Sequence, residues 1–251
     1  MCCTFSMERY YQIRNGEQIM YLYETHVHTV PLSACAKVGV RETLEFYKSA
    51  GYAGVFMTDH FIDGNIDRAL RELPYETRIE RYFDVYNEAL PIAREIGINI
   101  FSAFEMSYKG TDFLVYGIDK EWCLSHKDMD KMSKKELLSL IMEEGALVIQ
   151  AHPFREAGYI DHIRLFPRSV HGVEVFNACR TDFENELARQ YCDNYNLISF
   201  AGSDNHVGAA LPRFGGMVTE APIKDVRDFI DAVISGKAKP FIKEGDEIKL
   251  I

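Results

Sequence analysis

Short apolar runs alternate with longer amphipathic segments along this chain. Several of the runs are apolar throughout and rich in β-branched and aromatic residues, as expected of strands that are covered on both faces in a parallel sheet. Their lengths of four to eight residues suit strands better than helices. The predicted strands are residues 19–24, 52–58, 98–104, 112–118, 146–151, 172–176 and 197–202.

Helical segments lie between most of these runs. Ser133 with Glu136, and Thr181 with Glu184, have the spacing of a capping box, which predicts helices over 133–146 and 181–195. Pro91 predicts a kink or break within a longer helical pattern. The remaining predicted helices are 40–50, 76–97 and 224–237, the last followed by a short tail.

The alternation of strand and helix, repeated about seven times, predicts a closed or nearly closed α/β barrel. An open, doubly wound sheet is the competing layout. The chain has no linker rich in Pro, Gly or Ser and no repeat of fixed period, so residues 1–251 are predicted to form a single domain. In such barrels the functional residues lie in the loops that follow the carboxyl ends of the strands.

Charge narrows the classes of partner. The chain has 28 Lys and Arg against 38 Asp and Glu, a formal net charge of -10. This balance disfavours broad attraction to nucleic acid or to an anionic membrane, so neither is expected as a partner. An anionic substrate would then need another source of attraction, and bound cations are the obvious candidates.

The cysteines and the apolar segments predict a location. The six cysteines form no CxxC pair and no dense framework, which favours reduced thiols in a cytosolic protein. The first residues contain no signal-peptide pattern, and no window approaches the roughly 18 apolar residues of a membrane span. We therefore expect a cytoplasmic protein.

Metal-binding residue types gather where the predicted strands end. In the stretch ETHVHT, residues 24–29, His26 and His28 would point to the same side of an extended chain. A single histidine in a loop is usually a surface or core residue, but five of the eight histidines fall at the same end of successive strands. Mixed His and Asp or Glu sets suit first-row transition metals. The polar residues at these ends are His26, His28, Asp59, His60, Glu105, His152, Glu174, Asn177, Asp204, Asn205 and His206.

Five motifs in order give a resemblance to a known family. HVHT, TDH, AFE, AHPFR and GSDNH follow one another between about residues 22 and 210. In this they resemble the PHP family, named for polymerase and histidinol phosphatase. The resemblance implies a distorted seven-stranded β/α barrel, similar to a TIM barrel, that carries up to three metal ions at the carboxyl end of its strands and usually hydrolyses phosphate esters.

The resemblance also implies a set of ligands. Two or three divalent ions (Mn, Fe or Zn) would be held, with Glu105 bridging the first and the second. A carboxylate can do this because its two oxygens can contact two cations. The implied sets are His26, His28, Glu105 and Asp204 for the first ion, Glu105 and His152 for the second, and His60 and His206 for the third.

This chain departs from the family pattern in two places. Many members have Asp or His a few residues beyond HxH, where this chain has Ser33, Ala34 and Cys35, so occupancy of the third position stays open. We interpret Cys35 as a buried, inert thiol, with a thiolate ligand as the alternative. Many members have a histidine at the start of the strand after Glu105, where Asp112 stands as a competent substitute ligand.

The chemistry predicted for such a centre is phosphate ester hydrolysis. Divalent ions would bind the phosphate oxygens and lower the pKa of a bridging water, so that a metal-activated hydroxide is the nucleophile. His60, His206 and Asp204 are the candidate catalytic residues. The first two are possible general acids for the leaving group, as is a metal-bound water.

Three further residues are predicted to contact the substrate. Arg155, three residues after His152, is placed to clamp a phosphate, and Arg180 could do likewise. Asn177, with Glu174, would shape the pocket or support the ligands. The preferred substrate is a small phosphomonoester or a nucleotide-derived phosphate, because short loops after most strands leave little material for gripping a polymer.

Two other functions stay open. The same centre could hydrolyse amide or ring C–N bonds, as an amidohydrolase does. The chain could also be a non-catalytic metal-binding or regulatory domain. The sequence predicts neither the identity of the substrate nor the oligomeric state.

Overall fold

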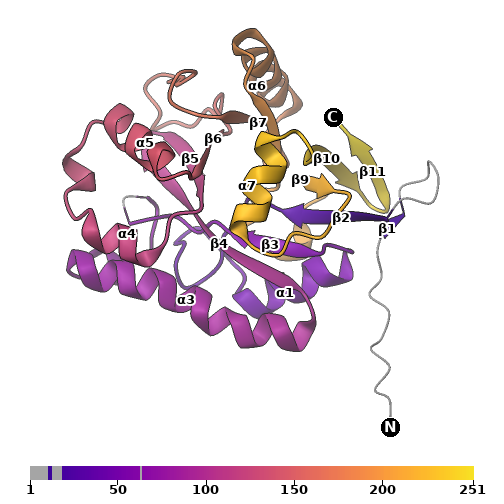
Figure 1. Cartoon of the computed structure of the whole chain (residues 1–251), viewed down its shortest axis with the longest axis horizontal. Helices are drawn as coiled ribbons and strands as arrows, with labels where there is room; N and C mark the ends of the chain where they lie inside the picture. Colours follow the sequence, from indigo (N-terminus) through magenta and orange to yellow (C-terminus); the bar gives the residue numbers. More distant parts are fainter. Residues whose placement is uncertain (1–10, 13–18, 63) are drawn as a thin grey trace.

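A computed structural model describes residues 11–12, 19–62 and 64–251 (Figure 1). Cys2 and Cys3 lie outside the described residues. The strands are β1 (Tyr11–Gln12), β2 (Ile19–Glu24), β3 (Gly54–Met57), β4 (Asn99–Tyr108), β5 (Thr111–Tyr116), β6 (Leu147–Ala151), β7 (Gly172–Asn177), β8 (Ile198–Gly202), β9 (Phe214–Thr219), β10 (Lys239–Glu244) and β11 (Glu247–Leu250). The α-helices are α1 (Val40–Ser49), α2 (Arg68–Arg71), α3 (Tyr75–Ile96), α4 (Lys120–Ser125), α5 (Lys134–Glu143), α6 (Asp182–Tyr195) and α7 (Val226–Ile234).

The strands join in one curled sheet with helices around it. Its order is β11-β10-β9-β2-β3-β4-β5-β6-β7-β8, with β1 paired to β2 beside this path. Figure 1 shows α1 and α3 along one side of the sheet and α4 and α5 along another. The predicted α/β class is therefore confirmed. The predicted count of seven strands is wrong, because β9, β10 and β11 extend the sheet path to ten.

The sheet is mixed, which the prediction of parallel strands did not anticipate. β4 and β5 pair antiparallel through a two-residue turn of Lys109 and Gly110, whose φ angles are 50° and 80°. Two consecutive positive φ angles are typical of the type I′ hairpin turn. In this hairpin Asp112, near the start of β5, lies opposite Ser107 near the end of β4. The antiparallel turn therefore brings Asp112 to the edge where β4 ends.

The curl brings β8 against β9. Within the described part of the chain no ladder joins these two strands, but the Gly215 amide donates to Ser203 Oγ at 2.9 Å. A Cβ atom on Gly215 would lie only 2.8 Å from the Gly202 carbonyl oxygen. Glycine at this position is what permits the close approach.

The helices follow their local signals. Capping boxes begin α5 at Ser133 and α6 at Thr181, as predicted. α3 continues through Pro91 rather than ending there, with Gly97 as its left-handed C-cap. None of the helices in the described residues is long and apolar enough to span a bilayer.

Aromatic side chains fill the interior of the curl below its functional edge. Phe56 stacks on Phe101 with ring centroids 4.7 Å apart, and Phe229 of α7 lies 4.2 Å from Phe56. Because side chains alternate along a strand, Phe101, Ala103 and Glu105 share one face of β4. Glu105 therefore stands two pleats above an aromatic floor.

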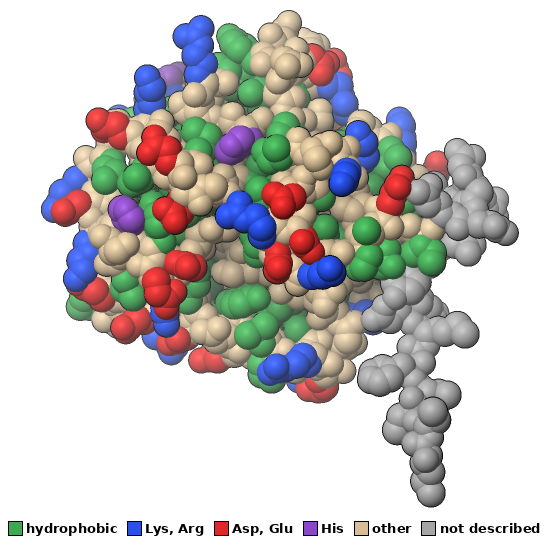
Figure 2. Space-filling model, viewed as in Figure 1, with side chains coloured by type: hydrophobic (Ala, Val, Ile, Leu, Met, Phe, Trp, Pro, Cys, Tyr) green, Lys and Arg blue, Asp and Glu red, His purple; other side chains and the backbone are tan. Residues whose placement is uncertain are grey.

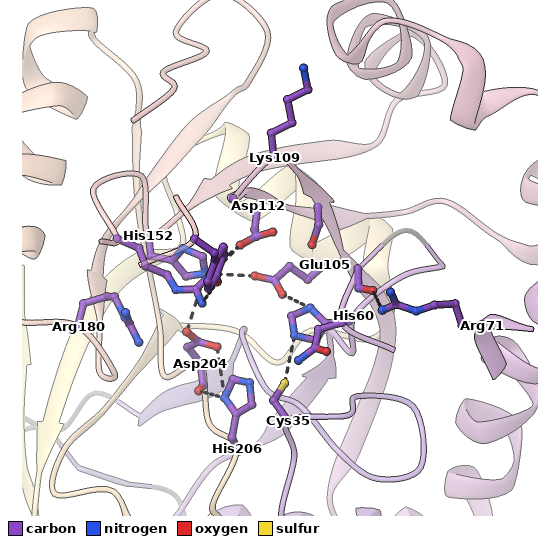
Figure 3. Close-up of a pocket in the computed structure, with 16 residues that line it drawn as sticks. Cys35, His60, Arg71, Glu105, Lys109, Asp112, His152, Arg180, Asp204 and His206 are labelled. Atoms are coloured by element: carbon purple, nitrogen blue, oxygen red, sulfur yellow. Dashed lines mark hydrogen bonds and ion pairs between the residues drawn. The ribbon is translucent and has the colours of Figure 1, made fainter. Parts of the chain in front are cut away.

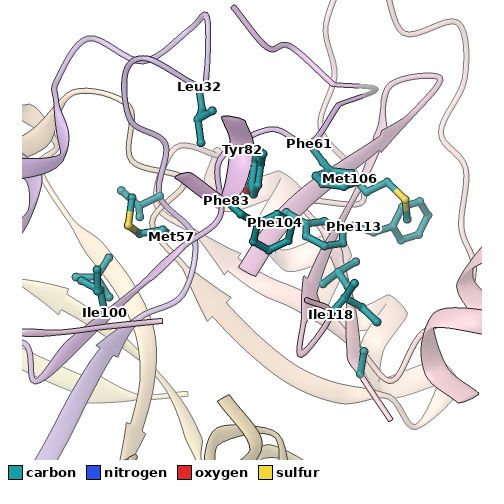
Figure 4. Close-up of a cluster of buried hydrophobic side chains, with 14 of the residues drawn as sticks. Leu32, Met57, Phe61, Tyr82, Phe83, Ile100, Phe104, Met106, Phe113 and Ile118 are labelled. Atoms are coloured by element: carbon teal, nitrogen blue, oxygen red, sulfur yellow. The ribbon is translucent and has the colours of Figure 1, made fainter. Parts of the chain in front are cut away.

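A second apolar cluster lies on the outer face of β4 (Figure 4). Phe61 stacks on Phe104 with centroids 4.2 Å apart, and Tyr82 of α3 meets the edge of the Phe61 ring. The Tyr82 hydroxyl is hydrogen-bonded to the carbonyl oxygens of Asp59 and Ala103 at 2.9 and 3.0 Å. This packing fixes the backbone on either side of the polar residues that follow β3 and end β4.

Candidate metal centre

Two short extended segments pair at the carboxyl edge of the sheet. Val27 and Asn205 form an isolated parallel bridge, with His28 N–H to Asn205 O at 2.9 Å and Asn205 N–H to His26 O at 3.2 Å. Neighbours on either side of a bridged pair point the opposite way from it. The side chains thus brought to one side are His26, His28, Asp204 and His206.

The first group of ligands is compact and buried. His26 Nε2 lies 3.2 Å from His28 Nε2 and 3.2 Å from Glu105 Oε1. Asp204 Oδ1 lies 3.2 Å from His28 Nε2 and 3.5 Å from His26 Nε2. Ligands at about 2.0–2.1 Å around a tetrahedral ion are about 3.3 Å apart. His26, His28 and Glu105 therefore have the spacing of ligands to one ion, and Asp204 lies beside both imidazoles.

The second group shares Glu105 with the first. His152 Nε2 lies 3.2 Å from Glu105 Oε1 and 3.9 Å from Asp112 Oδ2. Ligand atoms of these three residues lie within 4.8 Å of one another, and all three residues are buried. The arrangement suits a carboxylate between two cations.

A third group faces the cavity more openly. His28, His60 and His206 can bring ligand nitrogens within 4.8 Å of one another, and the rings of His28 and His206 stack with centroids 4.2 Å apart. Cys35 Sγ lies 3.2 Å from His60 Nε2. Cys35 is partly exposed and lines the cavity, so the prediction of a buried, inert thiol is wrong.

Glu174 orients two of the histidines from below. Its Oε1 lies 2.9 Å from His26 Nδ1, and its Oε2 accepts from the His152 backbone N–H at 3.0 Å. A carboxylate at Nδ1 holds the proton there and leaves Nε2 free to bind a cation. Asn177 donates to the same Oε2 at 2.8 Å, is fully buried and does not line the cavity. This corrects its predicted contact with substrate, because Asn177 instead holds Glu174.

Asp59 and Ser33 fix the loop that carries the first histidines. The Asp59 carboxylate accepts from Thr29 N–H at 2.6 Å and from Ser33 Oγ at 2.7 Å. Ser33 Oγ in turn lies 3.0 Å from His60 N and 3.1 Å from His28 Nδ1. The hydroxyl thereby links the loop to two of the histidines.

The electrostatics fit a bound cation. Burial raises the pKa of Glu105, but His60 and His26 outweigh it and hold that pKa well below its ordinary value. Burial, with His60 and His206 nearby, lowers the pKa of His28 to about 3, so this imidazole is neutral and can act as a ligand. Buried Glu105 Oε2 lies 2.7 Å from His60 Nδ1 and has no other hydrogen-bond partner among the described residues. A buried carboxylate beside the neutral imidazole of His28 is a donor set that suits divalent transition metals.

A cavity of about 660 Å³ opens above these residues (Figure 3). Arg155 and Arg180, the two arginines that the sequence suggested for phosphate binding, both line this cavity. Arg155 Nη1 lies 3.4 Å from Asp112 Oδ2, and the buried Nε of Arg180 has no hydrogen-bond partner among the described residues. Figure 3 shows Arg71 and Arg180 on opposite sides of the central carboxylates.

Several residues of the cavity wall were not predicted from the sequence, and three of them have side chains that can contact an anion. Arg71 comes from the four-residue helix α2, Lys109 from the β4–β5 turn, and Tyr159 from the loop after His152. The Arg155 guanidinium lies 5.4 Å from the centre of the Tyr159 ring. Of these three residues, only Lys109 could have been found from the sequence. It belongs to the Lys-Gly pair that follows the strand of Glu105 and that is typical of a hairpin turn.

Comparisons with known proteins agree with the predicted resemblance. The PHP-associated family (PHP_C) matches residues 182–238, and no curated protein sequence matches the chain. A two-domain protein from Bacteroides vulgatus, containing a predicted PHP-like metal-dependent phosphoesterase, has a similar structure at 13% identity and a TM-score of 0.63. The match covers 94% of this chain and 69% of that chain.

Two other similar structures carry different activities in their descriptions. A lesion-specific endonuclease from Pyrococcus furiosus is 12% identical with a TM-score of 0.55, over 88% of this chain and 58% of that chain. An amidohydrolase from Chromobacterium violaceum, with bound sulfate and no metal, is 14% identical with a TM-score of 0.50, over 88% and 97%. The fold is thus shared, and the resemblance to the PHP family is confirmed.

Proposed function

From this resemblance to the PHP family, we propose that the chain is a metal-dependent hydrolase of a small phosphate ester. The observation that carries the proposal is Glu105, which two groups of ligands share at the floor of a cavity with cationic walls. The first ion would be held by His26, His28, Glu105 and Asp204, and the second by Glu105, Asp112 and His152. Divalent ions there would supply Lewis acidity, which polarises a phosphoryl group and acidifies water.

The chain's own residues bind and orient the ester. Arg180 presents a buried Nε without a partner among the described residues, which suits an anionic oxygen. Arg155 is held beside Asp112 and lines the same cavity, so it is available to the same anion. His60 and His206 line the cavity next to Glu105 and Asp204, within reach of a leaving oxygen.

The size and charge of the cavity favour a small molecule. A volume of about 660 Å³ lies within the roughly 300–1,000 Å³ of small-molecule sites. Figure 2 shows acidic and basic side chains interspersed over the visible face, without a continuous basic track. Together with the net charge of -10, this pattern does not favour a long polyanion.

The test is hydrolysis by metal-depleted protein reloaded with Mn, Fe or Zn. The substrates are an aryl phosphate, sugar phosphates and nucleotides. We expect turnover that requires metal and falls at least about 100-fold in Glu105→Gln, since the loss of ion binding removes several kcal/mol of transition-state stabilisation. Glu143→Gln, an exposed position on α5, is the matched control and should keep full activity.

The same samples discriminate the alternatives. Amides, cyclic C–N substrates, and single- and double-stranded DNA are included in the panel. Hydrolysis of a C–N bond without any ester turnover would overturn the proposal in favour of an amidohydrolase. Tightly bound metal with no hydrolysis of any substrate would make the chain a binding or regulatory domain.

A further inference from the structure

We propose that Cys35 is a thiolate ligand to a third ion, which it holds together with His60 and His206. A thiolate ligand would make this third site selective for a soft divalent ion such as Zn. The inference rests on the proposed function only in that the centre binds metal. It assigns His60 and His206 to an ion rather than to proton transfer.

The distances suit shared coordination. Cys35 Sγ lies 3.2 Å from His60 Nε2, and Cys35 and His206 both line the cavity. Nitrogen at about 2.0–2.1 Å and sulfur at about 2.3 Å from a tetrahedral ion are about 3.6 Å apart. Figure 3 shows Cys35 and His206 side by side beneath His60, all facing the same space.

Cys35 does not stand alone. His28, His60 and His206 converge within 4.8 Å, and Glu105 Oε2 lies 2.7 Å from His60 Nδ1. These two atoms form a close ion pair and have no other hydrogen-bond partner among the described residues, and Glu105 is only 1% exposed. An imidazole cluster beside a buried carboxylate is an environment that suits a cation.

The backbone holds Cys35 in this place from both sides. The Ala34 amide donates to Asn65 O at 2.9 Å, and the Lys37 amide donates to His206 O at 2.8 Å. The loop is therefore tied to the segment that carries His206. The first residues after HVHT offer no carboxylate or imidazole, so sulfur is the ligand that this loop presents to the cluster. Thiolate ligands favour Zn over harder ions such as Mn.

The experiment uses the full chain loaded with Co(II), which gives a near-ultraviolet sulfur-to-cobalt charge-transfer band when a thiolate binds it. We expect the band in the native protein, its loss in Cys35→Ser, and its retention in Cys179→Ser. Cys179 is the matched control, since it is also partly exposed and its Sγ donates to Asp204 O. Zn content should fall by one equivalent per chain in Cys35→Ser alone.

A conservative variant tests the softness of the ligand. Cys35→Asp should retain the third ion but lower the preference for Zn over Mn at that position by at least about tenfold. A band that persists in Cys35→Ser, or that disappears in Cys179→Ser instead, overturns the assignment. So does a native protein that takes up no third ion.

A measurement on the native chain is independent of how the variants fold. Zn should protect Cys35 from iodoacetamide at least tenfold, read peptide by peptide by mass spectrometry, and equal alkylation with and without Zn overturns the proposal. Ester hydrolysis is measured in parallel. Turnover without the cobalt band refutes only the thiolate ligand, whereas the band without turnover refutes only the phosphoesterase.

Discussion

Glu174→Gln tests how the centre sets the state of its histidines. Glu174 faces three donors, which are His26 Nδ1 at 2.9 Å, His152 N at 3.0 Å and Asn177 Nδ2 at 2.8 Å. Glutamine keeps the shape of the side chain but replaces one acceptor oxygen by an amide donor. Turned one way, that donor opposes both His152 N and Asn177. Turned the other way, it donates to His26 Nδ1 and forces the ring proton onto Nε2.

The magnitudes decide between the two orientations. In the first orientation two buried donors would lose their hydrogen bonds, and each lost bond would cost about 1–3 kcal/mol of stability. Shifting the tautomer of His26 keeps a hydrogen bond and is therefore the cheaper choice. A proton on Nε2 removes that atom as a ligand, so we expect metal affinity to fall about 10–100-fold, or about 1.4–2.8 kcal/mol. The unfolding free energy of the metal-free variant should fall by about 1–2 kcal/mol, because the charged acceptor of Glu174 is replaced by a neutral one.

The assay is Zn affinity by competition with a chelator, with chemical unfolding of the metal-free protein beside it. Glu186→Gln is the control, because Glu186 is exposed on α6 and accepts a hydrogen bond from the exposed side of the same helix, from Gln190. Metal affinity within twofold of the native value would refute the tautomer argument. A large loss of stability without a loss of affinity would show that glutamine takes the other orientation.

Three further outcomes follow from the structure. Arg180→Ala should weaken inhibition by inorganic phosphate about 10-fold or more, since a charged hydrogen bond contributes about 1.5–3 kcal/mol; an unchanged inhibition constant would contradict its role. Phe104→Ala should lower the unfolding free energy by about 3–5 kcal/mol, because the ring stacks on Phe61 in a filled cluster; a urea titration showing under about 1 kcal/mol would contradict this. Burial lowers the pKa of His60, but the nearby Glu105 carboxylate outweighs it and raises this pKa to about 11. Burial also lowers the pKa of His206, but Cys179 and Cys35 outweigh it and raise this pKa to about 10. Both rings then carry protons in the metal-free protein near neutral pH, so metal affinity measured by calorimetry should rise with pH, and a flat profile would contradict the assignment.

The strands that could be predicted are those whose signal is local. Seven apolar runs are largely buried, and their hydrophobicity located β2 to β8 within a few residues. β9 reads FGGMVT, and its two glycines supply no side chains to such a pattern. β10 begins and ends with exposed Lys239 and Glu244, and β11 has exposed Glu247 and Lys249 at alternate positions, which resembles a solvated tail. Their place in the sheet depends on tertiary pairing with β9.

The candidate ligands were predictable for the same reason. His26 with His28, and Asp204 with His206, are spaced by two residues at strand ends, where alternation brings both side chains to one side. The orientation of Asn177 was not predictable, because it depends on a hydrogen bond to Glu174, which lies three residues earlier in β7. The position of Arg71 was not predictable either. It depends on how the four-residue helix α2 is placed within a long loop, and so short a helix has no hydrophobic periodicity.

The charges of the centre explain how an acidic chain can bind an anionic ester. Without metal, the floor of the cavity carries Glu105, Asp112 and Asp204, and the protonated rings of His60 and His206 offset part of their negative charge. Two divalent ions would contribute four positive charges, so the floor would become positive when they bind. Arg155 and Arg180 line the same cavity, so a phosphate that enters would meet cations of both the floor and the wall. The net charge of -10 would keep polyanions away, while the local field acts only on an anion that enters. Metal loading is therefore expected to strengthen substrate binding as well as to support chemistry, because the ions would neutralise the carboxylates at the floor of the cavity.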